Sequence, residues 1–330
     1  MRFSSQVQRL VAVASIAIAS SAVVPVSASA QTAWPSRPIT LIVPFAAGGG
    51  TDPIARAIAT KLSGRLGQPV IVDNRGGAGG TMGTSAVAKS PPDGYTILIA
   101  STSISTNVSS GKKLPYDPAK DLAPIGQVGA SPLLIVVSSE SKATTLKELL
   151  SQARANPGTI NYGSGGLGVI SHLGVELLAR GAGVQLVHVP YKGMAPAFTD
   201  MLGGSIQMLM PSPATATPHI AGGKVRALAV TSAQRSQFMP NVPTVAESGV
   251  PGFQVEFWWG LLGPSGMPQA VVKRLNEELN WALSQPDIRD LLARDGAVPK
   301  PGTPEDFRKL IAFELDRWNK LVKDANIKTD

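Results

Sequence analysis

The sequence has 330 residues, with 30 Lys and Arg against 22 Asp and Glu, and charged residues make up only 16% of it. A hydrophobic content of 43% excludes a disordered chain, and the absence of Cys excludes disulfides, thiolate metal sites and a Cys nucleophile. The length suits two domains. The 34 Gly and 27 Pro exceed the average share without a collagen-like period, so we expect them in loops, where binding groups tend to lie.

Residues 1–30 have the three parts of a secretory signal peptide. Arg2 and Arg9 bound a basic segment, an apolar run extends to Val24, and Ala28–Ala30 gives a small-x-small cleavage site. The apolar run is about 15 residues long, which is shorter than the roughly 20 that a membrane span needs. We therefore predict export and cleavage after residue 30. Basic runs are short and carry no interleaved aromatics, so we expect no nucleic-acid partner.

The first hundred residues after the predicted cleavage site alternate between strands and helices. The β-branched, Pro-bounded run 38–44 predicts a buried strand, and the loop 45–52 leads into a helix that ends at Gly67. Asp52 or Thr51 is the expected cap of this helix, with Pro53 at its first position. Strands at 69–72 and 95–100 and a helix at 84–89 follow. This alternation is typical of a parallel, doubly wound α/β sheet.

A second α/β unit repeats this pattern after a looser region that follows residue 118. The expected strands are 133–138, 159–162, 185–189, 206–210 and 225–231, and the expected helices are 145–155, 171–180 and 194–202. The chain closes with an apolar strand at 253–262 and amphipathic helices at 268–284 and 304–325. No low-complexity linker separates the two units, so we expect strands to join them.

Two strand–glycine loop–helix elements, at 43–56 and 162–176, give the strongest indication of a binding site. Glycine lets a backbone approach a ligand closely, and the first turn of a helix offers unpaired N–H groups at a partially positive end. Such an element binds a carboxylate or phosphate with main-chain groups. Small hydroxyls at Thr51, Ser164 and Ser171 add to both loops. The alternative is that these are ordinary turns of an α/β fold.

Other motifs predict neither a cofactor nor a metal ion. The segment 163–168 formally matches G-x-G-x-x-G, but the next strand ends in Pro190-Tyr191-Lys192 instead of the acidic residue of a dinucleotide site. No two of the three His have metal-ligand spacing. An exported hydrolase that uses Ser164 or Ser171 with His172 stays open as an alternative, although no third group that would orient the base is visible. Trp258 and Trp259 are expected in the core, where one of them could face a ligand.

Motifs along the whole predicted mature chain resemble those of periplasmic substrate-binding proteins of the tripartite tricarboxylate transporter type, the Bug or TctC family. The matching segments are WPSRPI (34–39), IVPFAAGGGTD (42–52), VDNRGGAGG (72–80), PDGYT (92–96), LPYDP (114–118), NYGSG (161–165), HVPYKG (188–193), RALAVT (226–231) and VPTVAESG (242–249). The resemblance implies a two-domain Venus-flytrap fold of periplasmic-binding-protein type II with the ligand cleft between domains. The implied domains are 31–127 with 257–330, and 128–256.

The resemblance also implies a function, a location and a site. The protein would be a periplasmic, non-enzymatic and monomeric receptor that captures a small carboxylate for the membrane subunits of a transporter; a ligand-binding sensor is the alternative. Main-chain amides and ordered water would hold the ligand. The implied binding residues are Phe45, Ala47, Gly48, Gly49, Thr51, Asp52, Thr102, Ser103, Ser164, Gly166, Gly168, Ser171 and Met210.

The chain departs from the family pattern at one point of this site. Gln207 and Met210 stand where the family often has Asp, so no carboxylate remains there to pair with a ligand amine. Met is soft and adaptable, and with Phe45 and a nearby Trp it would suit an apolar or aromatic ligand body. This pattern favours a di- or tricarboxylate or an aromatic acid over an amino acid.

Overall fold

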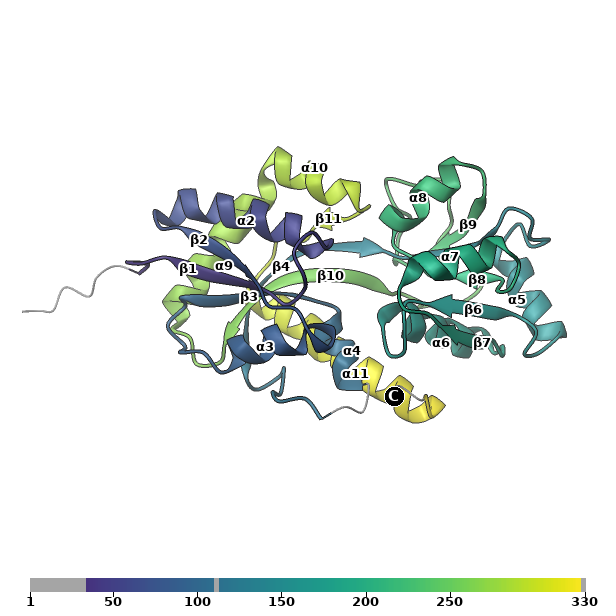
Figure 1. The fold of residues 1–330 in the computed structure, drawn as a ribbon, viewed down its shortest axis with the longest axis horizontal. Coiled ribbons are helices and arrows are strands. Elements are labelled where there is room, and N and C mark those ends of the chain that lie inside the picture. Colours follow the sequence, from purple (N-terminus) through teal and green to yellow (C-terminus); the bar gives the residue numbers. More distant parts are fainter. Residues whose placement is uncertain (1–33, 110–112, 328–330) are drawn as a thin grey trace, which may run out of the picture. The chain divides into compact units, whose positions relative to one another are not determined.

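Two β-sheets organise the chain in the computed structural model, which describes residues 34–109 and 113–327 (Figure 1). The predicted signal peptide lies outside the described residues. Sheet A has the order β11-β4-β10-β3-β1-β2, and sheet B has the order β7-β6-β8-β5-β9. Both sheets carry helices, so the predicted α/β class with two units of mixed strands and helices is confirmed.

Sheet A begins with the parallel strands that the sequence predicts, because β1 pairs with both β2 and β3 in parallel. The long strand β10 then pairs antiparallel with β3 and β4, which makes the sheet mixed. Its strands are β1 (Ile39–Val43), β2 (Val70–Asn74), β3 (Thr96–Ser101), β4 (Leu122–Pro132), β10 (Glu256–Pro264) and β11 (Val298–Pro299). The helices of this half are α2 (Thr51–Leu66), α3 (Thr81–Ala88), α4 (Ser103–Ser109), α9 (Gln269–Ser284), α10 (Pro286–Arg294) and α11 (Pro304–Ala325).

Sheet B is also mixed, since β6 pairs in parallel with β7 and β8 whereas β5 pairs antiparallel with β8 and β9. Its strands are β5 (Leu134–Ser138), β6 (Asn161–Ser164), β7 (Val187–Pro190), β8 (Met208–Leu209) and β9 (Val225–Val230). Its helices are α5 (Leu146–Ala155), α6 (Ile170–Ala182), α7 (Met194–Leu202) and α8 (Pro213–Ala221). A capping box at Thr145 and Glu148 begins α5, as the sequence pattern of a helix N-terminus requires.

Two strands and one helix join the halves. The strand β4 leads directly into β5, and β10 returns from the loop that follows β9 (Figure 1). The helix α11 places Phe307 and Ile311 in a core cluster of sheet A, and places Trp318 and Leu321 in the main core cluster of sheet B. The predicted domain boundary at 127/128 falls inside β4, and the one at 256/257 falls at the start of β10. These two boundaries stay a prediction.

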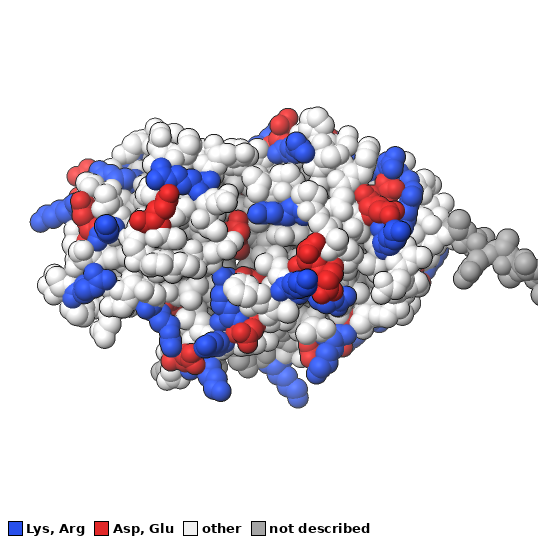
Figure 2. Space-filling view, turned by 180° about the vertical axis from the view of Figure 1, so that it is seen from behind, with Lys and Arg blue, Asp and Glu red and all other residues white. Residues whose placement is uncertain are grey.

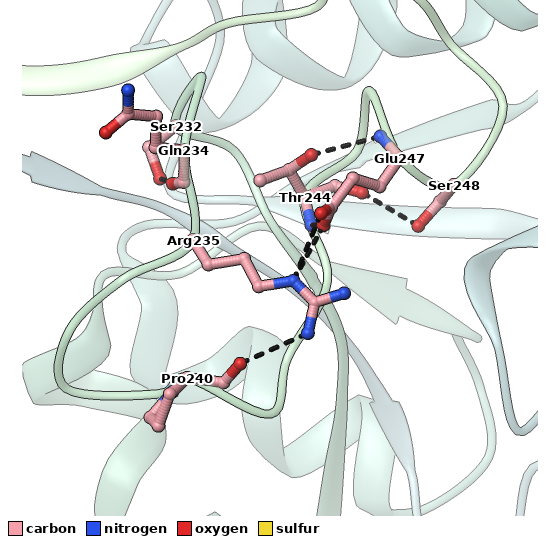
Figure 3. Close-up of polar contacts among 7 residues, drawn as sticks. All are labelled: Ser232, Gln234, Arg235, Pro240, Thr244, Glu247 and Ser248. Atoms are coloured by element: carbon pink, nitrogen blue, oxygen red, sulfur yellow. Dashed lines mark hydrogen bonds and ion pairs between the residues drawn. The ribbon is translucent and has the colours of Figure 1, made fainter.

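The segment between β9 and β10 carries one of the quoted family motifs, and its polar residues hold the segment together. The Glu247 carboxylate accepts from the Arg235 guanidinium at 2.9 Å and from the Thr244 backbone N–H at 2.7 Å. Arg235 also donates to the Pro240 carbonyl at 3.2 Å. Figure 3 shows Arg235 reaching between these two groups. The motif therefore has a structural role in this chain.

Some elements differ from the sequence prediction. The strand β4 lies in the region that we expected to be irregular, and α4, α8 and α10 were not predicted. The helix α3 begins at Thr81, before the predicted residue 84. The helices α4 and α8 escaped detection because Ser, Thr and internal Pro weaken a helical pattern, and α10 because it follows α9 after a single residue. For β4, pairing with β10 over its whole length overrides the turn-like residues Pro124 and Gly126.

Candidate functional site

The first glycine loop, residues 45–50, joins the buried strand β1 to α2, and its residues from Ala46 to Gly50 are exposed. The predicted capping of α2 is wrong: Gly50 occupies the cap position, no side chain caps the helix, and Pro53 is its third residue. Gly48 has a φ of +81°, a left-handed conformation that favours glycine. The loop therefore leaves main-chain groups accessible in front of a helix N-terminus.

The buried Asp52 carboxylate holds this loop in place through hydrogen bonds. Its Oδ2 accepts from the Gly48 N–H at 3.1 Å and from Arg56 Nε at 3.0 Å, and its Oδ1 accepts from Asn74 Nδ2 at 2.9 Å. Asn74 also donates to the Phe45 carbonyl at 3.2 Å. The hydrogen bond from Arg56 is the main cause that lowers the pKa of Asp52 below 3.8. The predicted binding residue Asp52 is thus engaged within the loop.

Residues far apart in the sequence support the start of α2. Thr51 is buried, and its hydroxyl accepts from the indole N–H of Trp259 on β10 at 3.2 Å. The neighbouring Trp258 exchanges two hydrogen bonds with Thr102: its N–H donates to the threonine hydroxyl at 2.9 Å, and its carbonyl accepts from the threonine N–H at 3.1 Å. Sequence reasoning placed the two Trp in the core, which the structure confirms, since both are at most 5% exposed.

The second glycine loop, residues 165–169, joins β6 to α6. Ser164 at the end of β6 is fully buried, and its hydroxyl donates to the Gly166 carbonyl at 2.8 Å and lies 2.6 Å from His188 Nε2. The Ser171 hydroxyl accepts from the Gly165 N–H at 3.2 Å. Both hydroxyls therefore bond to the backbone of the loop and hold its conformation. The side chains of Leu167 and Val169 are exposed. Gly166 and Gly168 have φ angles of +143° and +72°, which explains why glycine occupies these positions.

The helices that follow the two glycine loops, α2 and α6, begin without a side-chain cap. The helices α3 and α7, which follow Gly80 and Gly193, also lack one. In contrast, side chains of Thr145, Ser212 and Thr303 cap α5, α8 and α11. Uncapped first turns leave N–H groups available for water or an anion. Helices α9 and α10 also lack a side-chain cap, so the missing cap indicates a site only in combination with an exposed glycine loop.

The predicted site residues fall into two groups by exposure. Ala47, Gly48 and Gly49 are exposed, and Phe45, Ser103 and Gly166 are partly exposed. The others are buried, namely Thr51, Asp52, Thr102, Ser164, Gly168, Ser171 and Met210. Met210 lies in the core of sheet B with no exposed surface. Of the predicted residues, the structure brings Thr51 and Thr102 together through adjacent residues of β10, and α4, which begins at Ser103, contacts α6.

Sequence reasoning missed the residues that support the two loops. Asn74 and Arg56 bind Asp52, and His188 contacts Ser164. Asn74 and His188 do fall within the quoted family segments, but nothing local in the sequence assigns them a partner. The alternative of a hydrolase built on Ser164 or Ser171 with His172 fits poorly: both serines are buried, and Ser164 contacts His188 instead of His172.

The surface charge is mixed (Figure 2), and a large cavity lies away from the predicted site residues. Figure 2 shows Lys and Arg intermingled with Asp and Glu over the rear face, without a continuous basic stripe. A cavity of about 500 Å³ lies at another place, lined by the segment 232–237, Glu256 and Lys300, and it includes none of the predicted residues. Within 34–109 and 113–327, no group of three or more His, Asp and Glu could hold a metal ion. In the same two ranges, no helix is long and apolar enough to cross a membrane.

Comparisons with known proteins agree with the geometry. A family model described as "Tripartite tricarboxylate transporter family receptor" matches residues 54–327. Protein BugT of Bordetella pertussis is 40% identical over 323 residues, which cover 97% of this chain and 98% of that protein. The structure of Rpa4515 from R. palustris with adipate has 38% identity and a TM-score of 0.76, covering 89% of this chain and 99% of the other.

A further solved structure has a different bound acid. MatC from Rhodopseudomonas palustris with bound malate has 34% identity and a TM-score of 0.72, with 87% of this chain and 99% of the other covered. These matches confirm the predicted fold, a Venus-flytrap periplasmic binding protein. With glycine loops of the kind described above and a family match over most of its length, the chain belongs to the receptor family of tripartite tricarboxylate transporters, the Bug or TctC family.

Proposed function

We propose that this protein is a periplasmic receptor that captures a small carboxylate and delivers it to the membrane subunits of a tripartite tricarboxylate-type uptake system. The ligand would lie between the two halves of the chain, at the glycine loops 45–50 and 165–169. The protein would act as a monomer after removal of residues 1–30, and it would perform no chemistry on its ligand. The adipate and malate bound to the two solved relatives support a dicarboxylate.

The observation that carries this proposal is the exposed first glycine loop in front of the uncapped helix α2. Its exposed residues, Ala46 to Gly50, present backbone in place of charged side chains. Hydrogen bonds from main-chain N–H groups to a carboxylate are charge-assisted and strong, and the helix dipole favours the anion further. Asp52 does not oppose this, because Arg56 and Asn74 occupy its carboxylate.

A charge placed in each loop tests the proposal directly. Ala47 and Leu167 are exposed, so Ala47→Asp and Leu167→Asp add a negative charge without disturbing a core. Ala47→Asn and Leu167→Asn are matched controls, because they add nearly the same atoms without the charge. Calorimetric titration of the purified protein with adipate, malate, citrate, benzoate and glutamate identifies the ligand and measures the effect.

A carboxylate that binds between the loops should bind about tenfold more weakly to either Asp variant, while each Asn variant stays close to the unmodified protein. Equal affinity of the Asp and Asn variants would place the ligand elsewhere. Binding of glutamate more tightly than the other four acids would contradict the expectation drawn from Gln207 and Met210.

A further inference from the structure

Two imidazole rings, the buried one of His172 and the partly exposed one of His188, lie against the second glycine loop. His172 of α6 and His188 of β7 stack with their ring centroids 3.8 Å apart and an angle of 8° between the planes. The Tyr162 ring of β6 lies beside the pair, with its centroid 4.9 Å from that of His188 and 6.4 Å from that of His172. His172 is only 2% exposed. Two rings this close repel each other when charged, and the burial of His172 further disfavours a positive charge on that ring.

The hydrogen bonds define which nitrogen of each ring carries the proton. The Gly168 N–H donates to His172 Nδ1 at 3.0 Å, so Nδ1 carries a lone pair and the proton is on Nε2. The Ser164 hydroxyl has one proton, and the Gly166 carbonyl at 2.8 Å can only accept it. His188 Nε2, 2.6 Å from the same hydroxyl, must therefore be the donor.

We propose that His172 and His188 are positioning residues of the binding site, which as neutral Nε2–H tautomers hold the second glycine loop in its ligand-binding conformation. One ring accepts from Gly168 and the other donates to the hydroxyl that also contacts Gly166, so the pair controls the two glycines with positive φ. This inference rests on the proposed function for its effect on affinity, but not for the tautomers themselves.

Within residues 34–109 and 113–327, no carboxylate is hydrogen-bonded or ion-paired to either ring, whose hydrogen-bond partners are Ser164 and Gly168. Glu176 accepts from the Tyr162 hydroxyl at 2.5 Å, and Asp200 accepts from the Tyr191 hydroxyl at 2.7 Å. The remaining charged pair between elements at α6 is Arg180 with Asp324 of α11. Burial lowers the pKa of His172 to about 4, and burial together with His172 lowers that of His188 to about 4. A proton on His172 Nδ1 would point at the Gly168 N–H, so acid should release the loop.

Amide isosteres separate positioning from simple space filling. The amide group of Asn stands near the Nδ1 position of His, and that of Gln stands near the Nε2 position. His172→Asn can therefore still accept from Gly168, and His188→Gln can still donate to Ser164, whereas His172→Gln and His188→Asn place the amide at the wrong distance. His219→Gln is the matched control, because His219 lies on α8 and stacks on Phe198, away from the loop.

The first measurement needs no ligand. Nitrogen chemical shifts of imidazole-labelled protein at pH 7 should show both rings as Nε2–H tautomers, and the Gly168 amide should exchange slowly in the unmodified protein and in His172→Asn. An Nδ1–H tautomer or an imidazolium at either ring overturns the proposal. So does equal Gly168 exchange in His172→Asn and His172→Gln.

The second measurement is the affinity for adipate and malate from pH 7 to pH 4. His172→Asn and His188→Gln should bind within about threefold of the unmodified protein, and the mismatched variants about tenfold more weakly. Affinity should fall more steeply toward pH 4 in the unmodified protein than in the double isostere His172→Asn/His188→Gln, in which only the protonation of the ligand's own carboxylates remains. Equal loss in all four variants overturns positioning. If none of the five acids titrated above binds the unmodified protein, the proposed function fails, and the tautomers and the Gly168 exchange still decide this inference.

Discussion

Replacement of Asp52 by Asn removes one charge from the centre of the first glycine loop and leaves the volume unchanged. The Asp52 side chain is 8% exposed, and three donors surround it: the Gly48 N–H, Arg56 Nε and Asn74 Nδ2. An Asn amide can accept from one side only, so its NH₂ group would face at least one of these donors. The variant therefore loses hydrogen bonds to a charged acceptor and gains a contact between two donors.

The expected cost follows from these contacts. Hydrogen bonds to a charged group contribute about 1.5–3 kcal/mol each, but the Arg56 side chain is 53% exposed, so its share falls to about 0–1 kcal/mol. The remaining bonds lead us to expect a loss of about 2 kcal/mol in the free energy of unfolding for Asp52→Asn. Urea denaturation followed by circular dichroism measures this value from the transition midpoint at an unchanged m-value.

Asp73→Asn is the matched control for this experiment. Asp73 lies on β2 and pairs with Arg75 at 2.9 Å, but both side chains are more than a third exposed. The same substitution there should cost less than about 0.5 kcal/mol. Equal costs at positions 52 and 73 would refute the idea that Asp52 organises the first loop.

The pH dependence of the free energy of unfolding gives a second test of the Asp52 contacts. Because the folded state lowers the pKa of Asp52 below 3.8, its stabilisation is complete above pH 3.8 and is lost as the pH falls through the lower folded value. The Asp52→Asn variant should lack this part of the stability loss at low pH. An equal loss of stability at low pH in the unmodified protein and the variant would contradict the assigned contacts.

Three other predictions follow from particular contacts. Gly83→Ala should lower the free energy of unfolding by about 1–3 kcal/mol, because a Cβ there would lie 2.7 Å from the Arg75 carbonyl oxygen and 2.8 Å from Pro44 Cα. Gly64→Ala in α2 should raise it by about 0.5–1 kcal/mol, because a Cβ there meets nothing within 4 Å. Urea denaturation of both variants measures the two effects. Thr51→Val should leave the buried Trp259 indole N–H without its partner and lower the free energy of unfolding by about 1–3 kcal/mol. In a double-mutant cycle with Trp259→Phe, the double variant should lose less stability than the sum of the two single variants, and additive losses would contradict a direct hydrogen bond. Folding lowers the pKa of His172 from 6.5 to about 4, so its contribution to stability is full above pH 6.5 and is lost as the pH falls toward 4, by up to roughly 3 kcal/mol. The free energy of unfolding, measured at a series of pH values, should fall with decreasing pH more steeply in the unmodified protein than in His172→Asn.

The sequence by itself determined the elements that local chemistry controls. The β-branched run of β1 and the amphipathic pattern of α9 and α11 each predict their element from neighbouring residues. The two glycine loops stand out for the same reason, since left-handed φ angles such as that of Gly48 are a local requirement. The family resemblance likewise rests on motifs that are contiguous in the sequence.

Only the tertiary structure decided which residues support the loops. Thr51 meets Trp259 across 208 positions, and Ser164 meets His188 across 24, so the residues next to either partner do not reveal the other. Strand β4 exists because β10 pairs with it, although its own Pro and Gly predict a loop. Buried polar groups such as Asp52 and His172 must find partners wherever the fold brings them. For that reason their roles, and that of the partly exposed His188, emerge only from the folded chain.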